Sequence, residues 1–296
     1  MTPSNFLQKT WPERMETIQF YVRHSLAKVP YIPHPVRLKV SPSQEIAFWW
    51  SQIVPYFDRN RGFFDYWGTD IGDLRFLWNT LESGMVFMDI GAYHGIYSLV
   101  AGNKLKGTGE IIAFEPSPRE YQRLRMHLRL NRLSNAHAEM LAMGTAMAKT
   151  SFFQVSAGDT TRNGLRRPAS HDSVTEIPVN IISLDEYVCG QKIEHVDVMK
   201  LDVEGGEIDV IRGGPKVFGK LRPMLICEVL DATTQVWGYD AREIIDAVRN
   251  YDYDWFDFNL DGSIRAHSER QAYVEVKNYL AVPREKCELV IRQSSQ

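Results

Sequence analysis

The chain has 296 residues, of which 44% are hydrophobic and 24% charged, enough for one large domain with an extension or for two small domains. Its formal net charge is -3, so no overall field attracts nucleic acid or an anionic membrane. We expect no signal peptide, membrane span, disulfide framework or zinc site, because charges interrupt the apolar runs and the three cysteines are widely spaced; these features predict a cytoplasmic protein.

The first 75 residues are rich in proline and aromatic side chains, and we expect them to form an N-terminal extension. Its aromatic part, from Phe48 to Trp67, is typical of a buried core or a dimer contact, and it could also form a wall that stacks against sugars. A homodimer is compatible with this composition. We expect the main domain to span residues 76–286, followed by a short tail over residues 287–296.

Strands and helices alternate regularly after residue 75. Ser117 and Pro118 mark a helix start, and Glu120 is expected to complete a capping box there. The alternation predicts a Rossmann-like, doubly wound α/β fold with a mostly parallel, seven-stranded sheet. The strands expected in this domain are Met85–Ile90, Ile111–Phe114, Met140–Met143, Val196–Val203, Met224–Val229, Trp255–Asn259 and Asn278–Pro283.

The first strand of this domain ends in a glycine-containing turn with a carboxylate beside it. Gly91 allows a sharp turn and Gly95 allows the next helix to pack closely. The Gly-x-x-x-Gly spacing lacks the glycine that brings a dinucleotide pyrophosphate against a helix. Helix amides with Asp89 beside them instead suit the methionine part of S-adenosylmethionine, although the same residues could form a tight turn without any ligand.

Glu115 ends the second strand, 24 residues beyond Gly91. This separation is close to the roughly 20 residues expected for an acid that binds ribose hydroxyls. The alternative role is an electrostatic partner for the helix that starts at Ser117. Because Glu120 is expected to fill that role, we favour ribose binding for Glu115.

Several short motifs together resemble the FkbM-type methyltransferase family. They are Phe87–Gly95, Phe114–Pro118, Asn131, Ser183–Asp185 and Lys200–Glu207, and they span roughly residues 80 to 230 in the family's order. The resemblance implies a sheet of class I methyltransferase type, S-adenosylmethionine as cofactor, and O-methylation of sugars or polyketide-like natural products. It also implies that the cofactor contacts Asp89, Gly91, Ala92, Gly95, Glu115, Ser117, Leu141 and Ala142. The chain departs from the family pattern at Tyr93 and His94.

Charged residues gather at the ends of the fourth and fifth strands. Lys200, Asp202 and Glu204 alternate along one strand end, and Glu228 ends the next. Such charges are costly in an apolar strand unless they are paired or bind something. They therefore predict either a structural ion pair with a helix cap or a functional site, in which Asp202 or Glu204 positions or deprotonates the acceptor or helps to bind a divalent metal. His94 is a further candidate base, and local packing is its alternative role.

The expected reaction is methyl transfer to a small hydroxylated acceptor, such as a sugar or a glycosylated or polyketide product. A divalent metal is compatible with this chemistry, but no histidine or cysteine spacing indicates one. The loop Ser156–Glu176, which carries three arginines, is long enough to act as a lid. The alternatives are an NAD(P)-dependent oxidoreductase, for which Glu115 would also serve, and a non-catalytic binding protein that retains the fold.

Overall fold

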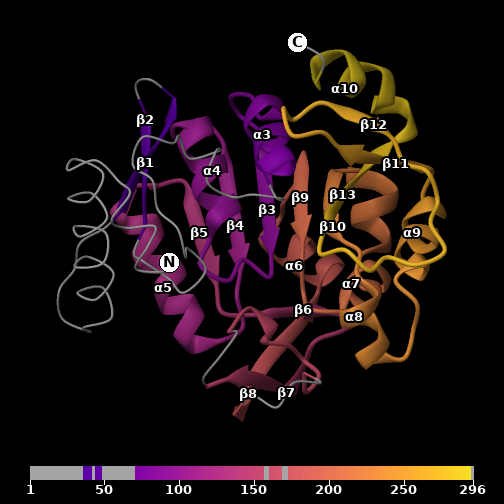
Figure 1. Cartoon of the computed structure of the whole chain (residues 1–296). Coiled ribbons are helices and arrows are strands. Elements are labelled where there is room, and N and C mark those ends of the chain that lie inside the picture. The colour runs from indigo at the N-terminus through magenta and orange to yellow at the C-terminus, as the bar shows by residue number, and fades with distance from the viewer. Residues whose placement is uncertain (1–35, 42–43, 49–70, 157–159, 169–172, 295–296) are drawn as a thin grey trace, which may run out of the picture. The chain divides into compact units, whose positions relative to one another are not determined.

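The computed structural model describes residues 36–41, 44–48, 71–156, 160–168 and 173–294 (Figure 1). The chain separates into two compact units, Met1–Tyr66 and Trp67–Gln296. In the first unit, β1 (Val36–Ser41) and β2 (Gln44–Phe48) pair as an antiparallel hairpin. The predicted aromatic stretch beyond Phe48 lies outside the described residues, so its roles stay predictions.

The second unit is built around a twisted, mostly parallel sheet with the strand order β12-β11-β13-β10-β9-β3-β4-β5 (Figure 1). Five neighbouring strands from β10 to β5 run parallel, and β13 lies antiparallel between β10 and β11. The strands are β3 (Val86–Ile90), β4 (Glu110–Phe114), β5 (Ala136–Glu139), β9 (Val198–Leu201), β10 (Met224–Glu228), β11 (Tyr253–Phe258), β12 (Ile264–Ala266) and β13 (Asn278–Pro283). The predicted doubly wound fold is confirmed, with β12 as one strand more than expected.

Helices cover the two faces of this sheet. They are α3 (Ile71–Thr80), α4 (Ile96–Leu105), α5 (Pro118–Leu130), α6 (Leu184–Gln191), α7 (Glu207–Arg212), α8 (Asp231–Thr234), α9 (Arg242–Arg249) and α10 (Cys287–Ser294), with a π-helical turn η4 (Val217–Leu221) and 3-10 turns η3 (Thr160–Arg162), η5 (Gln235–Trp237) and η6 (Arg284–Lys286). Met88 and Met199 belong to the core that α6, α7 and α9 cover. Because strand side chains alternate, Asp89 and Lys200 point to the other face, toward α4. No helix in the described ranges has the length and apolar character needed to cross a bilayer.

The expected third strand is the main difference from the sequence prediction. Met140–Met143 was expected in the central sheet, but Ala136–Glu139 occupies that place as β5. The structure instead puts Ala142–Gly144 (β6) in a second sheet, with β8 (Val174–Ser183) and β7 (Ala148–Val155). The prediction was wrong because β5 is a half-exposed edge strand whose sequence is less apolar than the residues that follow it.

Candidate functional site

The turn after β3 leaves no room for a side chain at Gly91. This residue has φ +80°, and a Cβ atom there would lie 1.7 Å from the carbonyl oxygen of Asp202. The N–H groups of Gly91 and Ala92 both donate to the carbonyl oxygen of Phe114, at 3.0 and 2.9 Å. The turn is therefore held between the ends of β4 and β9. It leads into α4 at Gly95, a left-handed N-cap that has no side-chain hydrogen bond.

Asp89 is the residue before the last one of β3, and its side chain is buried, with 1% of the residue exposed. Its carboxylate is bound by the first turn of α4. The backbone N–H of Ser98 donates to Asp89 Oδ2 at 3.0 Å, and Ser98 Oγ donates to the same oxygen at 2.6 Å. Burial raises the pKa of Asp89 to about 6, against the opposing effect of these two hydrogen bonds and of Lys200. Asp89 thus caps the start of α4, because the N-cap residue Gly95 has no side chain that could do so.

Glu115 follows β4 and is 5% exposed. Its carboxylate accepts one hydrogen bond from the backbone N–H of Tyr93 and one from that of Ser117, both at 2.9 Å. Burial raises the pKa of Glu115 to about 8, although the amides oppose that shift. Each carboxylate oxygen can accept more than one hydrogen bond, so Glu115 can still accept hydrogen bonds from further donors.

The predicted capping box at Ser117 is incomplete. Ser117 Oγ accepts from the backbone N–H of Glu120 at 3.4 Å, as expected for an N-cap. The side chain of Glu120 does not return to Ser117, because Glu115 already binds the Ser117 amide. Glu120 instead bonds to His94 and Arg119. The sequence prediction was wrong on this point, since local spacing could not show the competing carboxylate.

His94 is held inside the fold against α5. Its Nε2 lies 2.6 Å from Glu120 Oε2, and its ring stacks on Tyr93 with a centroid distance of 3.7 Å. His127 Nδ1 lies 2.7 Å from the His94 carbonyl oxygen. Burial lowers the pKa of His94, while Glu120 opposes the shift. The contacts describe a packed residue, and its catalytic role stays a prediction.

The predicted adenine contacts lie just beyond β5. Leu141 falls in the link between β5 and β6, and Ala142, 5% exposed, begins β6. The N–H of Glu115 donates to the carbonyl oxygen of Glu139 at 3.0 Å, so the end of β5 lies beside the end of β4. A ligand held at Glu115 would have these residues within reach on one side and the Gly91 turn on the other.

Lys200 and Asp202 form an ion pair at the end of β9, which is one of the two arrangements considered from the sequence. Lys200 is 1% exposed, and its Nζ lies 2.9 Å from Asp202 Oδ2 and 5.2 Å from the ring centroid of Tyr97. Burial lowers the pKa of Lys200, but the carboxylates of Asp202, Glu228 and Asp73 together outweigh this effect and the net shift is upward. The side chain of Asp202 is one-third exposed. The pair therefore joins a buried cation to a carboxylate that faces the edge of the sheet.

Three further residues of this site were not found from the sequence. Asp73 on α3 accepts hydrogen bonds at Oδ2 from Tyr97 Oη at 2.9 Å and from Asn278 Nδ2 at 2.5 Å. Asn278 also donates to Tyr97 Oη at 2.9 Å. These hydrogen bonds fix the position of Tyr97, whose ring Lys200 contacts. The sequence offered no signal for Asp73, because it lies within the segment predicted as an extension.

Two buried carboxyl groups stand near Asp202. Glu228 ends β10 and is 9% exposed, and its Oε2 has no hydrogen-bond partner among the described residues. Its pKa is raised well above the usual range by burial and by the charges of Asp202 and Glu204. Glu207 accepts from the N–H groups of Val203 and Gly205, at 2.9 and 3.4 Å, and burial raises its pKa to about 7. Glu207 thereby holds the loop that carries Glu204.

The arginine-bearing loop reaches this loop from the second sheet. An alanine-type Cβ at Gly164 would lie 3.4 Å from the Cβ of Glu204. The Arg166 guanidinium lies 5.0 Å from the ring centroid of Trp237, and Trp237 Nε1 donates to the Glu204 carbonyl oxygen at 3.0 Å. The described residues 160–168 therefore flank Glu204, and the lid role of the loop Ser156–Glu176 stays a prediction.

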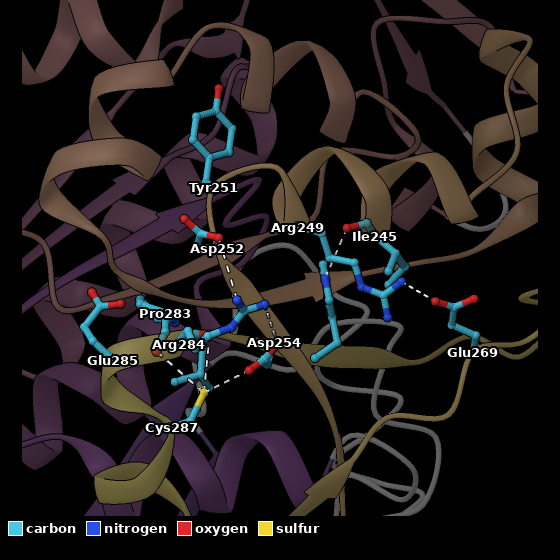
Figure 2. A network of polar contacts seen from close by, with 12 residues as sticks. Ile245, Arg249, Tyr251, Asp252, Asp254, Glu269, Pro283, Arg284, Glu285 and Cys287 are labelled. Carbon is cyan, nitrogen blue, oxygen red and sulfur yellow. Dashed lines mark hydrogen bonds and ion pairs between the residues drawn. The ribbon is translucent and has the colours of Figure 1, made fainter.

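A second polar network lies at the opposite edge of the sheet (Figure 2). There Cys287 Sγ lies 3.9 Å from Asp254 Oδ2, and Arg284 lies 3.4 Å from the same carboxyl group. Tyr253 pairs with Pro283, so this network adjoins the amino end of β11. It connects α10 to the sheet and contributes nothing to the strand ends described above. Among the described residues, no cluster of histidine, cysteine, aspartate and glutamate side chains has the geometry of a metal site.

Comparison with known proteins gives a consistent set of matches. A family model described as the methyltransferase FkbM domain matches residues 89–255. The hexuronic acid methyltransferase AglP of Haloferax volcanii is 27% identical over 147 residues, which cover 47% of this chain and 54% of that protein. Methyltransferase 1 of Beauveria bassiana is 24% identical over 162 residues, covering 49% of this chain and 64% of that protein. The chain thus matches less than two thirds of the length of either curated relative.

Among solved structures, the methyltransferase FkbM of Methylobacillus flagellatus is similar with a TM-score of 0.45 and 15% identity. The match covers 69% of this chain and 45% of that one.

Proposed function

The chain belongs to the FkbM methyltransferase family, and on that premise we propose that it transfers the methyl group of S-adenosylmethionine to a hydroxyl oxygen of a small acceptor. The observation that carries the proposal is the pairing of the Gly91 turn with Glu115 at adjacent strand ends. A sugar or a glycosylated or polyketide product is the proposed acceptor. The name of the Haloferax volcanii relative, a hexuronic acid methyltransferase, supports the sugar class.

The residues at the ends of β3 and β4 fit this cofactor. The Gly91 turn approaches β9 so closely that a side chain at this position would fill the turn, and Gly95, the N-cap of α4, has no side chain. The backbone amides around this turn and helix start suit the cofactor's carboxylate. Glu115 would accept from the ribose hydroxyls, with Ser117 beside it and with Leu141 and Ala142 against adenine. When bound, S-adenosylmethionine supplies an electrophilic methyl group on a positively charged sulfur.

The residues at the ends of β9 and β10 would handle the acceptor. Methyl transfer forms a bond between the hydroxyl oxygen and the methyl carbon, while the carbon–sulfur bond breaks and its electron pair stays on sulfur. The hydroxyl proton must pass to a base. Asp202, fixed by Lys200 and partly exposed, and Glu204, carried by the loop that Glu207 holds, are the proposed carboxylates for positioning the hydroxyl and accepting its proton.

Replacing Glu115 by glutamine tests the proposed cofactor site. We expect calorimetry to show binding of S-adenosylmethionine to the wild type and an affinity at least tenfold weaker for E115Q, because hydrogen bonds to a charged group contribute about 1.5–3 kcal/mol. Glu110→Gln is a matched control, since it makes the same change at the other end of β4. Binding of NADH without binding of S-adenosylmethionine would reverse the assignment in favour of an oxidoreductase.

The proposed ribose contact also predicts a pH dependence for adenosine, a probe that has the ribose but no amino acid group. The pKa of Glu115 is about 8, so the carboxyl group is largely protonated at pH 6. Donation from two hydroxyl groups favours the ionised form. Adenosine affinity should therefore rise from pH 6 to pH 8 and level off above it, whereas E115Q should give a flat profile. A flat wild-type profile in equilibrium binding would contradict the contact.

A further inference from the structure

The ends of β9 and β10 form an acidic edge made of Asp202, Glu204 and Glu228. Lys200 offsets part of this charge, but its Nζ is already engaged with Asp202. Glu228 is the unusual member, because its side chain is more than nine-tenths buried and its Oε2 has no partner in the part of the chain that the structure describes. A buried carboxyl oxygen without a donor is costly, and such a group is expected to have a ligand or a functional role.

This edge is adjacent to the proposed nucleoside site along the sheet. Glu115, Gly91, Asp202 and Glu228 stand at the carboxyl ends of four consecutive strands, β4, β3, β9 and β10. Neighbouring strands are about 4.8 Å apart. A nucleoside whose ribose lies at Glu115, with its 5′ substituent directed over Gly91, would therefore bring that substituent to Asp202. Asp202 and Glu228 follow the register partners Leu201 and Cys227, so they are neighbours across the two strands.

The charge of a ligand determines how favourably it binds at the acidic edge. Burial and the neighbouring carboxylates raise the pKa of Glu228, which shows that an uncompensated negative charge is unfavourable there. A cation placed against the edge would relieve this repulsion, and a neutral group would not.

We propose that Glu228, together with Asp202, distinguishes the positively charged cofactor from its neutral thioether product, S-adenosylhomocysteine. This inference rests on the proposed function. Methyl transfer removes the positive charge from sulfur and delivers a proton from the acceptor hydroxyl to a carboxylate of the acidic edge. The edge then holds a proton in place of the sulfonium, and the product loses its electrostatic attraction. The site would thus favour release of product after each turnover.

Equilibrium binding by calorimetry tests this selectivity without any acceptor. The probes are S-adenosylmethionine, S-adenosylhomocysteine and sinefungin, an analogue with a protonated amine on the carbon that replaces the methylated sulfur. We expect the wild type to bind both cationic ligands at least tenfold more tightly than S-adenosylhomocysteine. Glu228→Gln, which keeps the shape and removes the acid that can ionise beside a bound cation, should reduce this ratio to below threefold. Glu194→Gln, an exposed residue before the amino end of β9, should leave the ratio unchanged.

Each outcome decides between the two proposals. Equal affinity of the wild type for all three ligands overturns the charge selectivity while leaving the cofactor assignment intact. A tenfold preference that persists in a folded E228Q overturns the role of Glu228. If E228Q does not fold, as judged by its thermal melt, Asp202→Asn replaces it and must weaken the preference. Failure of all three ligands to bind the wild type would overturn the proposed function itself.

Discussion

Alanine at Gly91 is expected to destabilise the protein by about 3 kcal/mol or more and to abolish cofactor binding. The left-handed backbone at φ +80° costs about 1–2 kcal/mol for a residue with a Cβ. The new Cβ would also overlap the carbonyl oxygen of Asp202 at 1.7 Å, so β9 or the turn must shift. Overpacking of this kind costs a further 1–3 kcal/mol or so. Urea unfolding and calorimetry with S-adenosylmethionine measure the two effects.

Gly107→Ala is the matched control for that substitution. Gly107 has the same φ of +80°, but no atom of the described residues lies within 4 Å of the position of its Cβ. It should therefore lose only the backbone contribution and should bind the cofactor as the wild type does. If both variants were destabilised equally, the close approach between the Gly91 turn and β9 would contribute nothing to stability. The proposed cofactor site at this turn would then lose one of its supports.

Asp202→Asn is expected to lower the rate of methyl transfer about 100- to 10,000-fold, the usual contribution of a general base. Asparagine keeps an oxygen that can accept from Lys200, so the fold should survive, but it cannot take up the hydroxyl proton. Tritium transfer from labelled S-adenosylmethionine, with an acceptor found by screening sugars and glycosides against the wild type, gives the rate. Cofactor affinity should change by less than tenfold, since the loss falls on the chemical step.

The control for this rate effect is Asp209→Asn on α7, because Asp209 pairs with Arg212 and is away from the acidic edge. Its rate should match that of the wild type. A rate for Asp202→Asn equal to that of the control would make the Lys200–Asp202 pair purely structural, which is the alternative that the sequence left open. In that case Glu204→Gln becomes the decisive variant.

Local signals predicted much of the fold correctly. Ser117 and Pro118 start α5 as expected. These signals succeed because they depend on contacts within a few residues. The third strand was misplaced because an edge strand that buries little side chain has a weak apolar pattern. The three residues of β12 carry too short a pattern to stand out.

The candidate site was predictable only in part. Asp89, Glu115 and Lys200 could be found because each ends a strand, where parallel sheets bind ligands. Asp73 and Asn278 could not, because they are 205 residues apart in sequence and meet only through the strand order. Glu228 was found as a strand end, but its unpartnered oxygen depends on the burial supplied by its neighbours. Contacts between residues that are distant in the sequence are thus the part of the site that the sequence alone could not predict.

The antiparallel course of β13 has a practical consequence. Because this strand runs against its neighbours, Pro283 lies beside Tyr253 at the amino end of β11, and α10 follows from there. Helix α10 therefore lies on the far rim of the sheet from the acidic edge. A fluorescent reporter attached to an exposed side chain of α10 would stand clear of small molecules that bind at the acidic edge, so binding assays on the labelled protein should report the behaviour of the unmodified one.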